Sequence, residues 1–348
     1  KYNMINFHLT LEFNEYQLNS SAFPSEIRNS THEKFGQMLL DSAPVTHNSV
    51  KRPKSLALVG VFDGFGGSTV SSWLSKNMPF GIAKYIAQGK SPERALQHAF
   101  VHAEDILKNE KESKKVGSTA LIVIGASHAG CEEESDCRFI VANAGECLAV
   151  SIGFDGTLAI INEPHTPLNE SERRRVESAG GSSRFHTKII GLSCLSPKEV
   201  IDERYASTFE PGASHVSRFF GGMQAKMSFM PPFLISVPEV IAIEGGHTNV
   251  REESPHKAIA GILVFSSGIC AQSGARLKLN AIEKIVQPIM LKLIEDIKVQ
   301  ENEGADKFKV YSIIHTAAEQ IVNSIKKAAE KECRRLLVSS STYYKLSF

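Results

Sequence analysis

Residues 56–67 read LALVGVFDGFGG, and this stretch decides the fold. Its first seven residues are almost all apolar, which is typical of a strand buried on both faces. Asp63 ends the apolar run, and the glycines that follow it predict a tight turn. Apolar residues then recur at helical spacing, so we expect a helix over 68–88 that is capped by Ser68.

Strand patterns surround this stretch, and helical patterns follow them in separate groups. Residues 42–55 and 182–255 lack periodicity and are predicted to be irregular. Strands are expected in 1–20, 119–126, 138–144, 147–153, 157–162 and 259–266, and further helices begin near 92 and 171 and span 277–299 and 307–335. Because strands cluster and helices cluster, the pattern predicts antiparallel sheets packed together with helices outside.

The helix that follows Ser91 starts with Pro92, a residue favoured at the first helical position. Its predicted apolar stripe consists of Ala95, Leu96, Ala99, His102, Ala103, Ile106 and Leu107. This spacing predicts that all of them, including His102, face the core.

Composition excludes some classes of partner. The 348 residues carry a net charge of +1, so no strong field draws the chain to nucleic acid or to a membrane surface. No apolar run reaches the roughly 18 residues that a transmembrane helix needs. The six cysteines form no CxxC pair and show no zinc spacing, which indicates reduced thiols and a cytoplasmic or nuclear location. The chain begins at Lys1 rather than Met, which leaves open a removed preceding segment.

A series of motifs, in order over about 28–348, resembles the protein phosphatase 2C family of metal-dependent Ser/Thr phosphatases. They lie at 61–67, 117–120, 141–150, 155–156, 163–167, 172–181, 216–222, 237–240 and 260–271. The resemblance implies an α+β fold, an α/β/β/α sandwich of two central antiparallel β-sheets flanked by helices. It also implies one domain over 1–348, with an irregular, insert-rich region at 182–255.

The resemblance further implies two divalent cations, Mn²⁺ or Mg²⁺, held between the sheets by oxygen ligands. Asp63 matches the aspartate that bridges both metals, and Gly64 matches the glycine whose carbonyl is a ligand. Glu146 keeps an acid at a third family position. Upstream, 28–33 is similar to the family's R-x-x-M-E-D motif. Arg28 would then bind phosphate, and His32 and Glu33 would stand at two metal-ligand positions.

Other family positions have lost the chemistry that the resemblance implies. Phe65 stands where the family has a histidine proposed as general acid, and phenylalanine cannot donate a proton. Neutral residues replace acids or an amide at Ser267, Ala271, Gly222, Tyr343 and Tyr344. We therefore expect weak or absent Mn²⁺ or Mg²⁺ binding, and no residue is assigned as catalytic.

Several residues also have a purely structural interpretation. Asp63 could be a turn aspartate or a helix cap. The arginines at 173–175 fit a solvated helix face better than an anion site, and His165 fits a loop histidine better than a ligand. Phe65 is expected to pack into the emptied cavity.

These observations favour a pseudophosphatase that works by binding a phosphoprotein or a kinase-pathway protein, through Arg28 and the 182–255 region. The alternative is an active Mn/Mg-dependent Ser/Thr phosphatase whose ligands come from His32, Glu33, Asp63 and Glu146. A structural module unrelated to phosphate is a third possibility.

Overall fold

The computed structural model describes residues 4–14, 17–18, 53–128, 137–185, 207–210, 214–227, 233–244, 259–266, 277–305 and 307–341. Within them the strands form two stacked antiparallel sheets. The larger sheet has the order β11-β5-β4-β3-β1-β2, with β10 paired to β4. Its strands are β1 (Met4–Asn14), β2 (Gln17–Leu18), β3 (Pro53–Phe65), β4 (Gly117–His128), β5 (Cys137–Ala144), β10 (Phe220–Gly221) and β11 (Glu239–Glu244).

The smaller sheet has the order β12-β6-β7. It contains β6 (Leu148–Gly153), β7 (Leu158–Ile160) and β12 (Ile259–Phe265). A separate hairpin of β8 (Ser182–Phe185) and β9 (Ser207–Glu210) lies beside α4. The helices are α2 (Thr69–Ala87), α3 (Pro92–Leu107), η3 (Glu112–Lys114), α4 (Glu170–Ser178), α5 (Met223–Lys226), α6 (Leu279–Asn302) and α7 (Lys307–Ser341).

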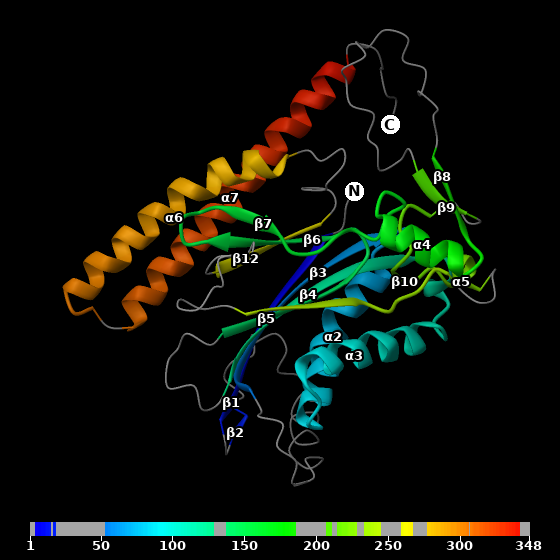
Figure 1. Ribbon diagram of the computed structural model, residues 1–348, viewed down its shortest axis with the longest axis horizontal. Coiled ribbons are helices and arrows are strands. Elements are labelled where there is room, and N and C mark those ends of the chain that lie inside the picture. Colours follow the sequence, from blue (N-terminus) through cyan, green and yellow to red (C-terminus); the bar gives the residue numbers. More distant parts are fainter. Residues whose placement is uncertain are drawn as a thin grey trace.

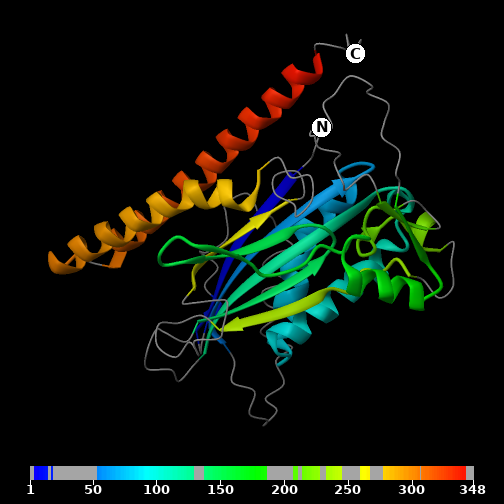
Figure 2. The same cartoon turned by 45° about the horizontal axis from the view of Figure 1, so that its top comes forward.

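Three apolar cores hold four layers together in the order α/β/β/α (Figure 1). One core joins α2 and α3 to the large sheet, through residues such as Leu74, Phe100 and Ile122. A second lies between the two sheets, where Leu121 and Val141 meet Ala149. The third joins the small sheet to α6 and α7. Figure 2 shows the two helix pairs on opposite sides of the sheets, so the predicted α+β sandwich is confirmed.

The alternation of side chains in β3 explains how one strand serves two cores. Phe62 faces the helical layer and Val61 faces the second sheet, because successive side chains point to opposite faces. Asp63 therefore lies on the side of Val61, at the end of the space between the sheets. The apolar run that ends at Asp63 is thus a central strand buried on both faces, as predicted.

Some local predictions were wrong. β3 begins at Pro53, inside the stretch expected to be a loop, because proline is tolerated at the first residue of a strand. Ser68 precedes α2, but its side chain makes no capping hydrogen bond. The 182–255 region is irregular only in part, since β8, β9, β10, α5 and β11 lie within it.

The outer stripe of α3 also differs from the prediction. Ser91 caps the helix, and Leu96, Ala99 and Ala103 are buried as expected. His102 and Ile106 are exposed instead. The buried face of α3 is rotated away from them, toward Phe100, which is buried with Leu96, Ala99 and Ala103. In the described part of the chain, no helix combines the length and apolar character needed to cross a membrane.

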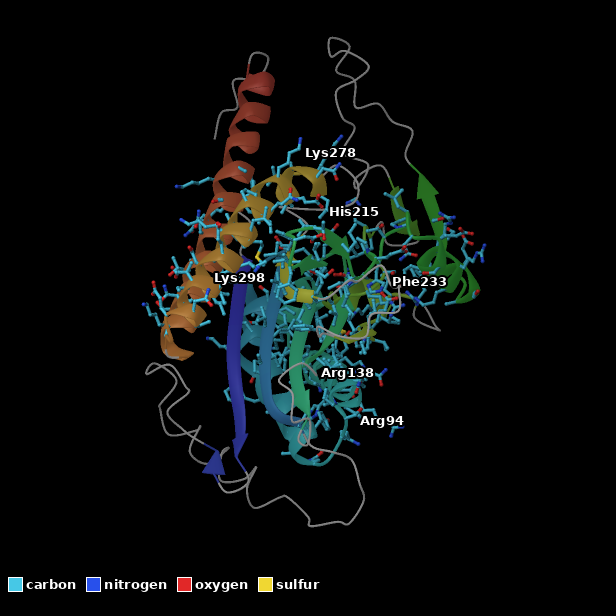
Figure 3. The ribbon with its side chains drawn as sticks, turned by 60° about the vertical axis from the view of Figure 1, so that its left-hand side comes forward. Arg94, Arg138, His215, Phe233, Lys278 and Lys298 are labelled. Atoms are coloured by element: carbon cyan, nitrogen blue, oxygen red, sulfur yellow. The ribbon has the colours of Figure 1, made fainter. Side chains whose placement is uncertain are left out.

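The layers are joined by polar contacts at their ends. Arg138, at the start of β5, forms an ion pair with Glu93 in the first turn of α3, with 2.5 Å between Nη1 and Oε1. Figure 3 labels Arg138 and Arg94 in this part of the molecule; it also labels Lys278, just before α6, and Lys298, in the last two turns of α6.

Candidate functional site

The candidate site lies where β3 ends, between the two sheets. Asp63 is half-buried and pairs across the sheet with Thr119 of β4. The Thr119 hydroxyl is 3.4 Å from Sγ of the buried Cys147, which belongs to the core between the sheets. The Ser118 hydroxyl donates to the Asp63 carbonyl at 3.3 Å. The Asp63 carboxylate is therefore held on a rigid element at the end of the core.

The turn after Asp63 needs its glycines. A Cβ added to Gly64 would meet the Gly67 carbonyl oxygen and the Ser71 hydroxyl at 2.7 Å. Gly66 has φ +72°, a backbone conformation that costs glycine little. The chain can therefore turn from β3 into α2 within a few residues, directly beside Asp63.

Phe65 is the aromatic residue at this turn. Its side chain is 39% exposed, and its ring meets Phe219 edge to face, with 5.2 Å between centroids and an interplanar angle of 79°. This is a favourable geometry for an aromatic pair. Phe65 thus packs against one aromatic neighbour while part of its surface faces solvent, and the expectation that it fills an emptied cavity stays a prediction.

A buried histidine braces the loop that carries Glu146. The Nδ1 atom of His165 accepts from the backbone N–H of Gly145 at 3.1 Å and lies 3.4 Å from Nδ2 of Asn143. Its Nε2 atom is 3.6 Å from a carboxylate oxygen of Glu239, which is 43% exposed. Because Nδ1 accepts, the proton of the neutral ring lies on Nε2 and points to Glu239.

His165 lies in the loop between β7 and α4, as expected, but it is buried there, with only 2% of its surface exposed. Burial lowers the pKa of His165, and the nearby Glu239 carboxylate opposes that shift only in part. The proximity of His165 in turn lowers the pKa of Glu239. His165 is therefore a neutral structural residue that holds the loop of Gly145 and Glu146.

A second buried network ties α4 to the segment before β10. Glu172 accepts from Nη2 of Arg218 at 2.8 Å, from Nε of Arg175 at 2.7 Å and from the Ser217 hydroxyl at 2.5 Å. Burial raises the pKa of Glu172, but these hydrogen bonds outweigh burial and lower the pKa to about 2. Arg175 also donates to the carbonyl of Phe233, labelled in Figure 3 beside α4 and the β8–β9 hairpin.

The three arginines at 173–175 therefore do not form one solvated face. Arg174 is exposed and pairs with Glu170, as expected for a surface residue. Arg173 donates to the carbonyl of Pro167, and Arg175 belongs to the buried network. The prediction of a solvated face holds for Arg174 and is wrong for Arg175.

A buried contact with Lys226 fixes the position of Phe219. The Lys226 ammonium donates to the Glu104 carboxylate and to the Phe219 carbonyl, and it lies 4.5 Å from the centre of the Phe219 ring. Burial lowers the pKa of Lys226, while Glu104 opposes that shift. The second carboxylate oxygen of Glu104 accepts from the N–H of Gly221 at 3.1 Å. Phe65 thus packs on an aromatic side chain whose own position is fixed.

Gly222 has a structural reason to lack the acid that the resemblance implies. It has φ +58°, and an added Cβ would lie 2.7 Å from Cε2 of Phe219. An aspartate here would therefore displace the ring that supports Phe65.

The described donors do not fit a pair of divalent cations. Among the described residues, no group of three or more His, Cys, Asp or Glu side chains is placed to hold a metal. Two adjacent dications need several anionic oxygen ligands, because they repel each other strongly. Asp63 and Glu146 are half-buried and keep their acids, and Gly64 keeps its carbonyl. The remaining predicted positions lie outside the described residues: Arg28, His32, Glu33, Ser267, Ala271, Tyr343 and Tyr344.

Comparison with known proteins gives this site its context. The model of the family described as Protein phosphatase 2C matches residues 25–244. The chain belongs to the protein phosphatase 2C family. It is 35% identical over 132 residues to "Probable protein phosphatase 2C 2" of Arabidopsis thaliana, which covers 36% of this chain and 31% of that protein. It is 25% identical over 202 residues to "Protein phosphatase 1L" of Bos taurus, which covers 55% of this chain and 51% of that protein.

The chain thus spans 31% and 51% of the length of these two curated relatives. Among solved structures, it is similar to serine-threonine phosphatase 2C from Toxoplasma gondii, with a TM-score of 0.46 and 14% identity over 83% of this chain and 87% of that chain. Family membership therefore rests on the match of the family model.

Sequence reasoning did not identify several residues that build the site. Phe219, Asn143, Glu239 and Arg218 each contact a predicted position or its support. All four lie within the family motifs, but nothing in the residues themselves indicated which distant side chain each would meet.

Proposed function

We propose that this chain is a catalytically impaired member of the protein phosphatase 2C family, a pseudophosphatase that acts by binding. One observation carries the proposal: the Phe65–Phe219 aromatic pair lies beside Asp63, where the family resemblance requires a proton donor. An aromatic hydrocarbon ring cannot protonate a leaving group. Phosphate ester cleavage at this place would therefore proceed without general acid assistance.

The surroundings of the pair support a binding role. Phe219 is fixed by the Lys226–Glu104 contact, and Gly222 leaves room for its ring. Phe65 is partly exposed, so it offers apolar surface at the end of the sheets. The fold around the former site is thus kept rigid, although its acid–base chemistry is reduced.

The partner that we propose is a phosphoprotein or a kinase-pathway protein. Two features support this choice of partner. The family fold is retained, and Arg28 is an arginine, whose guanidinium can hydrogen-bond two phosphate oxygens at once. If docking depends on phosphate, phosphorylated lysate should yield partners that the same lysate, dephosphorylated beforehand, does not. Equal recovery from both lysates would contradict phosphate-dependent docking.

An active Mn²⁺- or Mg²⁺-dependent phosphatase is the second candidate. It is favoured by the position of Asp63 at the end of a central strand, with Gly64 next to it and Glu146 on a braced loop. His32 and Glu33 would have to complete the ligand set. In this case the metals would activate water, as is usual for paired metal sites.

Hydrolysis of a small aryl phosphate with and without millimolar Mn²⁺ separates the two candidates. We expect wild-type turnover near background under both conditions. The matched variant is Phe65→His, which restores a proton donor at the same position. Metal-dependent turnover of the wild-type chain well above background would overturn the proposal.

A further inference from the structure

The outer surface of the α2–α3 layer contains a depression of about 610 Å³. It is lined by Tyr85 of α2 and by a row of α3 side chains that includes His98, His102 and Asp105. This surface belongs to the helical layer rather than to the space between the sheets. The proposed function of the chain does not use it.

His98 and His102 are four residues apart on α3, so their side chains share one face of the helix. Both are exposed, unlike their neighbours Ala99 and Ala103, which are buried in the core. The two imidazoles therefore lie outside the apolar core that holds the helix. Both side chains line the depression, which is open to solvent.

Tyr85 packs against both imidazoles and orients one of them. Its ring centre lies 5.3 Å from that of His98 and 6.2 Å from that of His102. Its hydroxyl oxygen is 2.8 Å from Nδ1 of His102. When the His102 proton lies on Nδ1, the imidazole donates to the Tyr85 oxygen, and Nε2 keeps a free lone pair. Fixing one imidazole nitrogen in this way is how proteins prepare the other for a metal.

Two carboxylates lie among the other residues that line the depression, beside Val101, Ile106 and Asn109. Asp105 follows His102 by three residues and forms an exposed ion pair with Lys108 at 2.8 Å, and Glu110 lies further along the same rim. These two carboxylates make the rim attractive to cations. They are on the surface and have water around them, so they leave room for water ligands.

We propose that His98 and His102 form a surface site for one late first-row transition metal dication: Zn²⁺, Ni²⁺ or Cu²⁺. Imidazole nitrogen suits these metals, whereas Mn²⁺ and Mg²⁺ prefer oxygen. The two imidazoles supply two ligands, and water completes the coordination shell. Tyr85 is a positioning residue that orients the ring of His102.

Calorimetric titration of the tag-free chain with Cu²⁺, Ni²⁺ or Zn²⁺ tests the proposal. We expect His98→Ala and His102→Ala each to weaken one binding event by about tenfold or more. The double variant should lose that event and lower the bound metal by one ion per chain. The matched control is His315→Ala, because His315 is exposed on α7 beside Glu319 and has no histidine partner four residues away.

Spectroscopy of the Cu²⁺ complex gives a second readout. Coordination by two imidazole nitrogens should appear as nitrogen hyperfine splitting that disappears in the double variant. Tyr85→Phe should weaken binding within the about 10–100-fold range that is typical of lost outer-shell partners. Unchanged stoichiometry and an unchanged spectrum in the double variant would overturn the proposal.

Discussion

The ring of Phe65 lies over the backbone of Gly117, its cross-strand partner in the β3–β4 pair. A Cβ added to Gly117 would fall 2.2 Å from Cζ and 2.6 Å from Cε2 of Phe65. No side chain larger than hydrogen fits at that distance. The position of the Phe65 ring at the end of β3 therefore requires glycine at position 117, at the start of β4.

The close contact between Gly117 and Phe65 predicts that substitutions at the two positions have non-additive effects on the free energy of unfolding. Gly117→Ala should destabilise the fold by about 1–3 kcal/mol, because a methyl group is forced against the ring. In a Phe65→Ala background the same change should cost less, since the ring is gone. Urea unfolding of the four combinations measures the coupling. Equal costs of Gly117→Ala in both backgrounds would show that the ring contact is not the cause.

Glu172 should be among the most sensitive positions for stability. Glu172→Gln removes the charge that compensates two arginines while keeping the shape of the side chain. Because the carboxylate is only 2% exposed, the free energy of unfolding should fall by about 3–5 kcal/mol.

Glu170→Gln on the same helix provides the matched control for Glu172→Gln. Its partner, Arg174, is 75% exposed, so this change should cost no more than about 1 kcal/mol. Chemical unfolding of both variants makes the comparison. Similar costs for the two changes would contradict a stabilising role for the buried network.

The lowered pKa of His165 predicts a loss of stability in mild acid. The folded state resists protonation of His165, whereas the unfolded chain takes up a proton near the ordinary value of 6.5. Stability is therefore fully present above that pH and falls as the pH drops below it. Thermal unfolding measured from about pH 7.5 to about pH 5, a range that spans the ordinary histidine pKa, gives the slope.

A His165→Gln variant should show a smaller slope over the same pH range, although its stability at neutral pH is lower. The low pKa of Glu172 acts in a different window: its contribution is present above the ordinary value of 4.5 and is lost as the pH falls toward about 2. An unchanged slope in His165→Gln would assign the acid sensitivity near pH 6 to another group.

The neutral residues at two family acid positions predict a gain of metal binding. Ser267→Asp and Tyr343→Asp together should raise Mn²⁺ affinity, because each adds an anionic oxygen ligand. Calorimetry with Mn²⁺ compares the double variant with the wild-type chain. A matched control is Ser267→Asn with Tyr343→Asn, which adds oxygen without charge. No gain in the acidic variant would mean that these positions are wrongly aligned with the family.

The strands and helices were largely predictable because their signals are local. The apolar run before Asp63 predicted β3, and Pro92 after Ser91 predicted the start of α3. The Asp155-Gly156 pair between the predicted strands at 147–153 and 157–162 is typical of a hairpin turn, and Gly156 has the positive φ of +78° that such a turn needs. These features depend on neighbours in the chain.

The side-chain partners were not predictable, because they join distant segments. Glu172 meets Arg218 from 46 residues away, and Phe65 meets Phe219 only because β10 pairs with β4. The exposure of His102 likewise depends on where α2 crosses α3, which brings Tyr85 to it. Spacing alone placed His102 in the core, and that prediction was wrong.

β1 covers the long edge of β3, from Met4 opposite Asp63 to Glu12 opposite Ser55. A chain cut before β3 would leave that row of N–H and C=O groups unpaired, and bare strand edges invite pairing with other molecules. Among the described strands, β1 has only the two-residue β2 on its other side, so loss of β1 would turn β3, whose residues face two apolar cores, into the edge strand. Protein shortened at its N-terminus would be expected to aggregate even though every helix and every acidic residue near Asp63 described above is still present.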